Sequence, residues 1–456
     1  MKANRQSRRI VMFFASFVIL AVLTALWAFV WYNHYDEAIG NPFFRKGNWL
    51  VIAVYALLSF VFTNIYGGYK IGHLKRGDVM YSAILSTLFV NGVTYLQISL
   101  MGRYFLLVSP MAILTVVDVI CIVIWAVLAH QLYQTLYPPR KMLLIYGRNG
   151  IESLINKINS RSDKYEVCEM IHIEEGMDTV LARIDCYESV VLCDIHSQKR
   201  NELLKYCFAN SIRTYLTPNI SDTIVRGADE IHLFDTPLLL CKNRGLSFEQ
   251  NLLKRIFDVT LTFCALIASS PLFVLIAAAI KLQDGGPVFY KQARLTLDGR
   301  EFTLYKFRSM IVDAESKCGA QLAQKNDARI TPVGRFIRKV RLDELPQLIN
   351  ILRGDMSIVG PRPERPEIVS EYEDYIPEFR FRLKVKAGLT GYAQVLGKYN
   401  TTPYDKLKLD LMYIEKYSFL LDIKLILMTI KILFMPASTE GVDDATELTN
   451  SLANKS

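Results

Sequence analysis

Hydrophobic residues gather in four long runs in the first third of the chain. The runs cover roughly residues 10–32, 49–66, 80–101 and 105–132. Each is close to or above the ~18–20 residues that a helix needs to cross about 30 Å of hydrocarbon. The first run follows basic residues, as in a signal peptide, but its apolar core is too long and no small-residue cleavage site follows it. The pattern predicts four transmembrane helices within residues 1–139.

Basic residues flank these runs unequally. The N-terminus, the segment between the second and third runs, and the exit from the fourth carry Lys2, Arg5, Arg8, Arg9, Lys70, Lys75, Arg76, Arg140 and Lys141. The opposite loops hold Arg45, Lys46 and Arg103. Because cytoplasmic loops are enriched in Lys and Arg, both ends of the four-helix block are expected in the cytoplasm.

Residues 140–250 have the pattern of a soluble α/β domain. Short apolar strands are expected at 141–147, 189–194 and 214–218, and "ESLINKIN" after the first strand has helical spacing. The turn "YGRNG" offers Gly147 and Gly150 but no complete G-x-G-x-x-G, and no acidic ribose ligand is evident. We therefore predict a Rossmann-like domain that binds no nucleotide.

A fifth apolar run, residues 256–282, is interrupted in its middle by Ser269, Ser270 and Pro271. Proline removes a helical hydrogen bond, and serine hydroxyls can satisfy the carbonyl groups that it frees. Basic residues flank both ends of the run. Two interpretations are open at this point: a kinked helix that spans the membrane, and a re-entrant helix that bends at Ser-Pro and returns to the same face. The second accounts for both the break and the flanks.

The last third of the chain is basic and rich in short motifs. Residues 418–434 place Asp422, Lys424 and Lys431 among apolar residues. This pattern suits a helix in the plane of the membrane interface, with an ordinary core helix as the alternative. Residues 436–456 are polar, with one proline and no aromatic residue, and are predicted to be disordered.

Composition narrows the functional classes. The chain is 51% hydrophobic and 21% charged, and its mean hydropathy is +0.21, which is typical of a membrane protein with soluble parts. The net charge of +9 suits cytoplasmic flanks, anionic lipid or a phosphorylated substrate. No nucleic-acid-binding module accompanies that charge, so nucleic acid is not an expected partner. The 8 cysteines include no C-x-x-C pair, which argues against a zinc site or a disulfide framework.

The segment "RLDELPQLINILRGDMSIVGPRP", residues 341–363, holds the clearest candidate chemistry. Asp343 stands where a helix N-cap is expected, Glu344 follows in the first turn, and Gly354 lies just past the end. The apolar face of this helix is Leu345, Leu348, Ile349 and Leu352. A purely structural interpretation is therefore available, in which Asp343 caps the helix and Glu344 complements its dipole.

Cations surround this carboxylate pair in the sequence. They are Arg294, Lys306, Arg308, Arg335, Arg338, Lys339, Arg341, Arg353 and Arg362. A salt-bridge network would explain them. A diphosphate site would explain them too, because arginine forks match phosphate oxygens and a carboxylate can hold Mg²⁺ against those oxygens. The prolines of "GPRP" would fix the backbone that aims Arg362.

Taken together, these features resemble the bacterial polyprenyl-phosphate hexose-1-phosphate transferases with four N-terminal transmembrane helices, which initiate exopolysaccharide, capsule or O-antigen synthesis. The resemblance is carried by residues 252–435: "LLKRIFD", the Ser-Pro break, "GPVFYKQAR", "YKFRSM", the segment 341–363, "KAGLTGYAQV" and "LDLMYI". Two positions depart from the family pattern, Thr296 in place of a glycine and Ala387 in place of a proline. Both concern local turn geometry rather than the carboxylate pair.

The resemblance implies a membrane α plus α/β fold: the four-helix block, the cytoplasmic Rossmann-like domain, and a mainly α catalytic domain at 251–435 with interfacial amphipathic helices. The run 256–282 becomes its re-entrant helix, broken at Ser270 and Pro271. The implied reaction transfers a hexose 1-phosphate, usually of glucose or galactose, from a UDP-sugar to undecaprenyl phosphate with release of UMP. The implied location is the cytoplasmic face of the bacterial inner membrane.

The resemblance also assigns roles to residues and partners. Asp343 would be the nucleophile that forms an aspartyl-phosphosugar and would bind Mg²⁺, and Glu344 would assist it. Substrate phosphates would be held by Arg338, Pro361, Arg362, Pro363, Lys306 and Arg308, with a purely structural role left open for Lys306 and Arg308. The implied partners are the UDP-sugar, undecaprenyl phosphate, membrane lipids, further copies of this chain in a homo-oligomer, and downstream glycosyltransferases.

Two other functional classes fit less well. A nucleotide-sugar dehydratase or epimerase would need a complete glycine fingerprint and a Tyr-x-x-x-Lys pair in residues 141–250, which contain neither. A sensor or scaffold would be favoured by loss of carboxylates or cations around Asp343, and none is missing.

Overall fold

A computed structural model describes residues 2–37, 46–147, 151–241, 245–312, 327, 329–397 and 401–433. The chain divides into two compact units, residues 1–217 and 218–456, which we describe separately. The predicted disordered tail, 436–456, lies outside the described residues.

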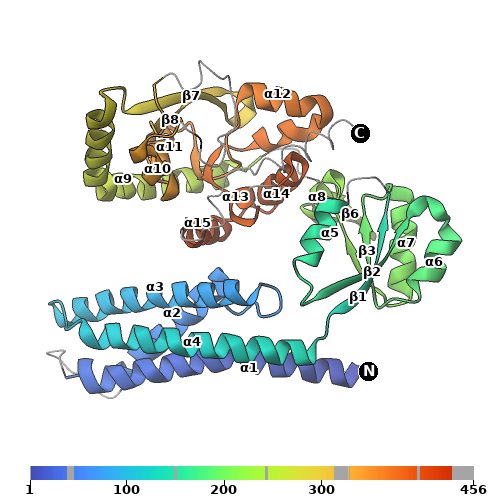
Figure 1. The fold of residues 1–456 in the computed structure, drawn as a ribbon, viewed down its shortest axis with the longest axis horizontal. Helices are drawn as coiled ribbons and strands as arrows, with labels where there is room; N and C mark the ends of the chain where they lie inside the picture. Colours follow the sequence, from blue (N-terminus) through green and yellow to red (C-terminus); the bar gives the residue numbers. More distant parts are fainter. Residues whose placement is uncertain are drawn as a thin grey trace. The chain divides into compact units, whose positions relative to one another are not determined.

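The first unit begins with four long antiparallel helices (Figure 1). They are α1 (Lys2–Val30, continued by the π-helical turn η1, Trp31–Tyr35), α2 (Lys46–Tyr66), α3 (Arg76–Gly102) and α4 (Ser109–Leu136). All four are long and apolar enough to cross a membrane. Their shared core contains the large rings of Trp27, Trp31 and Tyr55.

A polar chain runs through the interior of these helices. The Tyr55 hydroxyl donates to Asn91 Oδ1 at 2.9 Å, and Asn91 Nδ2 donates to Asp118 Oδ2 at 3.0 Å. Polar groups in an apolar interior are costly unless they are paired, so these bonds constrain how α2, α3 and α4 pack.

A parallel four-stranded sheet of order β2-β1-β3-β4 follows. Its strands are β1 (Arg140–Tyr146), β2 (Tyr165–His172), β3 (Ser189–Cys193) and β4 (Arg213–Leu216). One face packs on α5 (Glu152–Asn159), and the other on α6 (Met177–Ile184) and α7 (Ser197–Ala209) (Figure 1). The three strands expected from sequence are confirmed. Sequence patterning missed β2, in which only Ile171 is buried and the apolar Cys168 and Met170 are exposed, so the strand lacks the continuous apolar run that marked the others.

The second unit is mainly helical. Its elements are α8 (Ile220–Arg226), β5 (Asp229–Leu233), β6 (Thr236–Leu240), α9 (Phe248–Asp284), β7 (Phe289–Leu295), η3 (Leu297–Gly299), β8 (Glu301–Phe307), α10 (Pro332–Lys339), η4 (Leu342–Glu344), α11 (Gln347–Arg353), β9 (Ser357–Val359), α12 (Pro366–Tyr375), η5 (Pro377–Lys384), β10 (Gly388–Thr390), α13 (Tyr392–Leu396), α14 (Pro403–Glu415) and α15 (Phe419–Leu433). Residues 218–250, grouped by sequence with the α/β domain, cluster with this unit because Ile220 of α8 enters its core.

Helix α9 contains the Ser-Pro break, at which it bends sharply but remains helical (Figure 1). Proline at 271 has no N–H to donate to the carbonyl of Ile267, and the Ser270 hydroxyl donates to that carbonyl instead, at 2.8 Å. Ser269 donates similarly to Ala265 at 2.7 Å. The prediction that serines satisfy the freed backbone groups is confirmed, and such back-bonding also favours a bend.

The first half of α9 is joined to the rest of the unit by two buried charged residues, Lys254 and Asp258. Lys254 Nζ lies 2.5 Å from Asp422 Oδ2 of α15, with both side chains buried. Asp258, one turn further on, accepts hydrogen bonds from Ser357 Oγ at 2.7 Å and from the Ile358 amide at 3.1 Å. Asp422 thus belongs to the interior of the unit, which supports the core-helix alternative for that face of α15.

Replacing Lys254 with methionine should destabilise the protein strongly, because it leaves the buried Asp422 carboxylate without its cation. Breaking one side of a buried pair costs about 3–5 kcal/mol. Denaturant unfolding of the purified protein in detergent would measure the loss. The control is Lys424→Met on the exposed side of α15, and an equal effect of both changes would contradict the buried ion pair.

Candidate active site

The carboxylate pair lies in a tight 3₁₀ turn rather than at the start of the following helix. Arg341 adopts a left-handed conformation, with φ 56°, and η4 carries Asp343 and Glu344. Helix α11 begins only at Gln347 and ends at Arg353, and Gly354 just past its end has a φ of 90°. The predicted helix end is confirmed. The prediction that Asp343 is the N-cap is wrong, because tertiary ion pairs hold the turn outside the helix.

Those ion pairs converge on Glu344. Its Oε1 atom lies 2.7 Å from Arg362 Nη2 and 3.3 Å from Lys306 Nζ, and its side chain is only 14% exposed. Burial by itself would raise the pKa of Glu344, but the charges of Arg362 and Lys306 outweigh burial and lower the pKa well below its usual range. Glu344 is therefore a fixed anion at neutral pH.

Asp343 is in the opposite situation. Burial and then the adjacent charge of Glu344 raise the pKa of Asp343, against the opposing charges of Lys306, Arg338 and Arg362. In the part of the chain that the structure describes, no side chain or backbone amide hydrogen-bonds to its carboxylate. Neighbouring carboxylates whose pKa values are driven apart can take different chemical roles. Here Glu344 is held by cations, whereas Asp343 is available to react.

The Pro-Arg-Pro turn that supplies Arg362 is tied at every carbonyl. Those of Pro361, Arg362 and Pro363 accept, in order, from the amide of Gly388 at 2.8 Å, Arg382 Nη2 at 2.9 Å and Arg294 Nη1 at 3.1 Å. The approach to Gly388 leaves no room for a side chain, because a Cβ there would lie 2.1 Å from the Gly360 nitrogen. This backbone anchoring fixes the point from which Arg362 reaches Glu344.

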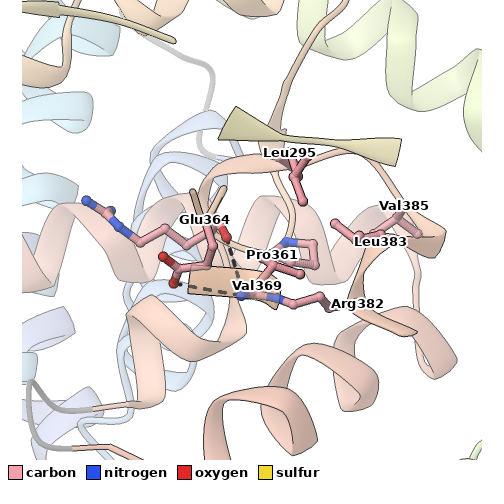
Figure 2. A pocket seen from close by; sticks show the side chains of 9 residues that line it. Leu295, Pro361, Glu364, Val369, Arg382, Leu383 and Val385 are labelled. Atoms are coloured by element: carbon pink, nitrogen blue, oxygen red, sulfur yellow. Dashed lines mark hydrogen bonds and ion pairs between the residues drawn. The ribbon is translucent and has the colours of Figure 1, made fainter. Parts of the chain in front are cut away.

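A small pocket beside this turn is a packing site rather than a substrate site. Its volume is about 10 Å³, which holds at most one water molecule. Pro361 and the ion pair of Arg382 with Glu364 line it (Figure 2). Arg382 also lies 2.8 Å from Asp410 of α14. These charged groups lie beside the turn and support it.

The structure brings together most of the site residues predicted from sequence. Lys306, Arg338 and Arg362 act electrostatically on the Asp343–Glu344 pair. Arg308 does not join them. It is buried and forms a two-pronged ion pair with Asp284 at the end of α9, which supports the structural role left open for it.

Four residues support the Pro-Arg-Pro turn, namely Arg294, Glu364, Arg382 and Asp410. Sequence reasoning counted Arg294 only among the cations near the carboxylate pair, and it missed the other three. Two of them stand in motifs that marked the family resemblance, Arg294 in "GPVFYKQAR" and Asp410 in "LDLMYI", so those motifs were a usable signal. Arg382 had no comparable signal.

The donor groups fit Mg²⁺ only together with substrate phosphates. No cluster of three or more His, Cys, Asp or Glu side chains that could hold a metal occurs among the described residues. Mg²⁺ in phosphoryl-transfer sites usually takes one or two carboxylates and completes its shell with phosphate oxygens and water. The carboxylate of Asp343, which has no hydrogen-bond partner among the residues described, fits that pattern.

Comparison with known proteins matches residues 249–436 to the model of a family described as "Bacterial sugar transferase". The chain is 32% identical over 384 residues to UDP-N-acetylgalactosamine-undecaprenyl-phosphate N-acetylgalactosaminephosphotransferase of Aeromonas hydrophila, covering 81% of this chain and 86% of that protein. This chain belongs to the bacterial sugar transferase family. It is a transferase, and the family match contains the carboxylate pair and all the cations around it.

Other relatives match a smaller part of their length. Undecaprenyl-phosphate glucose phosphotransferase of Komagataeibacter xylinus is 33% identical over 64% of this chain and 58% of its own length. UDP-glucose:undecaprenyl-phosphate glucose-1-phosphate transferase of Escherichia coli K12 is 41% identical over 45% of this chain and 44% of its own length. The chain thus spans about half the length of these two sugar transferases.

Asp410 predicts an unusual pH dependence of stability. Burial raises its pKa from 3.8 to about 6, despite the opposing charge of Arg382. The pKa of Asp410 is higher in the folded than in the unfolded protein, so its protonation stabilises the folded state. This contribution to the free energy of unfolding is fully present below pH ~4 and is lost as the pH rises through ~6. We expect the unfolding free energy of the wild type, relative to Asp410→Asn, to fall by roughly 2–3 kcal/mol between pH 4 and 7.

Denaturant titrations of both proteins across that pH range would measure the difference. Asp374→Asn, at an exposed position of α12, is the matched control and should show a flat difference. If the unfolding free energy of the wild type rises with pH relative to that of Asp410→Asn, the burial argument is contradicted.

Proposed function

We propose that this transferase moves a hexose 1-phosphate from a UDP-sugar to undecaprenyl phosphate, giving undecaprenyl-diphospho-sugar and UMP. The reaction would be the first membrane step of exopolysaccharide, capsule or O-antigen synthesis. The observation that carries the proposal is a partly buried carboxylate, Asp343, without a hydrogen-bond partner among the described residues, next to a fixed anion and cations in the family's matched segment. The relatives named above, which act on undecaprenyl phosphate, support the choice of lipid acceptor.

The reaction would proceed in two displacements on one phosphorus. A carboxylate oxygen of Asp343 attacks the phosphorus that bears the sugar, forming an aspartyl-phosphosugar and breaking the bond to UMP, which leaves. A phosphate oxygen of undecaprenyl phosphate then attacks the same phosphorus. The bond to Asp343 breaks, and the free carboxylate is restored. The raised pKa of Asp343 makes its anion a stronger nucleophile once ionised.

The surrounding residues would hold charge rather than move protons. Glu344 is ionised and bound to two cations, so it would position Arg362 and Lys306 instead of accepting a proton. Arg362, Lys306 and Arg338 would bind phosphate oxygens of the diphosphate, where charge-assisted bonds are strongest. Mg²⁺ bound through Asp343 and the substrate phosphates would neutralise further charge. Residues Pro361 and Pro363 fix the turn.

The second unit would sit on the cytoplasmic face of the inner membrane, where nucleotide-sugars are available. The bend in α9 at Ser270 and Pro271 would return the helix to the face that it entered, as a re-entrant helix. Exposed apolar side chains along α9, including Ile256, Ile267 and Leu275, would then face lipid. A homo-oligomer and downstream glycosyltransferases remain the proposed protein partners.

Replacing Asp343 with asparagine should abolish transfer, because the amide cannot form the acyl-phosphate. We expect a loss of roughly 10³-fold or more in both UMP release and labelled lipid product from radiolabelled UDP-sugar. Asp355→Asn removes a carboxylate of the same segment that pairs with the exposed Arg300, and it should retain activity. Wild-type amounts of lipid product from Asp343→Asn would overturn the nucleophile assignment.

The re-entrant course of α9 can be tested with single cysteines in a cysteine-free background. Phe248 and Leu282 lie near the two ends of α9 and are 77% and 87% exposed. Cysteines at both positions should react with a membrane-impermeant maleimide from the cytoplasmic side in inverted vesicles. Labelling of the two positions from opposite sides would show that α9 spans the membrane and would place the carboxylate pair outside the cell.

A further inference from the structure

A second cavity, of about 600 Å³, lies inside the first unit, where its long helices meet the α/β domain. Side chains from α1, α4 and the segment between α2 and α3 form one part of its wall, and side chains beside the sheet form the other. A volume of this size accommodates a small-molecule ligand. The cavity contains no residue of the proposed transferase site.

The junction around this cavity is held by specific contacts. Arg161 of the α/β domain donates to the carbonyls of His73 at 2.6 Å and Gly72 at 3.3 Å, and it pairs with Asp163 at 2.9 Å. Gly72 has a φ of 73°, and a Cβ there would lie 2.1 Å from the Tyr133 ring of α4. The segment between α2 and α3 is therefore packed closely against both neighbours.

The wall of the cavity is strongly basic. It carries Arg9, Arg140, Lys164 and Arg213, and none of its described residues is acidic. Burial, followed by the charges of Lys164, Lys70, Arg161 and Arg140, lowers the pKa of His73, as expected in a positive field. Tyrosine rings and hydroxyls add polar groups, and Arg140 donates to the Tyr215 hydroxyl at 2.9 Å. This combination is suited to a phosphate group.

One side of the cavity is apolar. Met12 and Phe13 of α1 line it. Phe13 is 58% exposed and the adjacent Phe14 62% exposed, so an apolar surface leads from the cavity along a helix long enough to span a membrane. A water-soluble phosphate would make no use of this surface, whereas an acyl chain would lie along it.

We propose that the cavity binds the headgroup of an anionic phospholipid, with the phosphate between Lys164, Arg213 and Arg140 and an acyl chain along α1. Basic pockets at the cytoplasmic ends of transmembrane helices bind lipid headgroups in this manner. The site lies outside the matched transferase segment, so it goes beyond the proposed function. A bound lipid would join the membrane helices to the α/β domain.

The test uses the full-length protein in detergent, with lipid binding followed by native mass spectrometry. The probes are dioleoylphosphatidylglycerol, dioleoylphosphatidylcholine and inorganic phosphate. The double variant Lys164→Gln/Arg213→Gln removes two cations of the wall. The matched control, Lys199→Gln/Lys205→Gln, removes two cations from exposed positions of α7. Circular dichroism and unfolding midpoints establish that both variants fold.

We expect phosphatidylglycerol to bind at least tenfold more tightly than phosphatidylcholine, because choline cancels the phosphate charge. The Lys164→Gln/Arg213→Gln variant should lose at least tenfold in phosphatidylglycerol binding, and the α7 control less than twofold. Equal binding of the two lipids, equal loss in both variants, or displacement of the lipid by millimolar inorganic phosphate would each overturn the proposal. Since the readout is binding rather than transfer, failure of the proposed function leaves this result interpretable.

Discussion

The second unit depends on burying a few charges of an otherwise apolar helix. Most side chains of α9 are hydrophobic, and many of them are exposed, so hydrophobic contact alone would not orient this helix. Lys254 and Asp258 are the buried charged residues of α9, and each is too costly to bury without a partner. Their partners lie on α15 and β9, so one rotation of the helix satisfies both groups. Because β9 leads directly into the Pro-Arg-Pro turn, the same contacts connect the helix to the candidate site.

The candidate site rests on separating two adjacent carboxylates. In sequence, Asp343 and Glu344 are equivalent acids one residue apart. In the folded chain, Glu344 takes the cations of Arg362 and Lys306, and its negative charge then adds to burial in raising the pKa of Asp343. One group becomes a fixed counter-ion, and the other is a carboxylate without a hydrogen-bond partner in the part of the chain that the structure describes. The proposed nucleophile follows from this asymmetry rather than from either residue alone.

Charge is also concentrated at the junction within the first unit. The cations that flank the membrane helices in sequence, including Arg9 and Arg140, meet Lys164 and Arg213 of the α/β domain around one cavity. The sequence had explained the flanking cations through membrane orientation. Membrane orientation does not require these cations to lie next to cations of the α/β domain. Their position around one cavity therefore supports a second role, the proposed binding of a lipid headgroup. Both units therefore use positive charge beside apolar helices, one for the proposed diphosphate chemistry and one for the proposed lipid headgroup.

The sequence by itself determined features that arise from neighbouring residues. Helix length follows from the apolar runs. The serine hydroxyl that satisfies the carbonyl freed by Pro271 belongs to Ser270, three residues from the carbonyl of Ile267, so local geometry was sufficient. Sequence also located the basic segment around Asp343, because the motifs are contiguous. The tertiary structure decided the rest: the N-cap prediction failed, Arg308 paired with Asp284, and Arg382 emerged behind the turn. These outcomes rest on contacts between separate segments, such as the Lys306–Glu344 pair, 38 residues apart. Local periodicity contains no information about which distant charges must share a buried site, and only packing makes that choice.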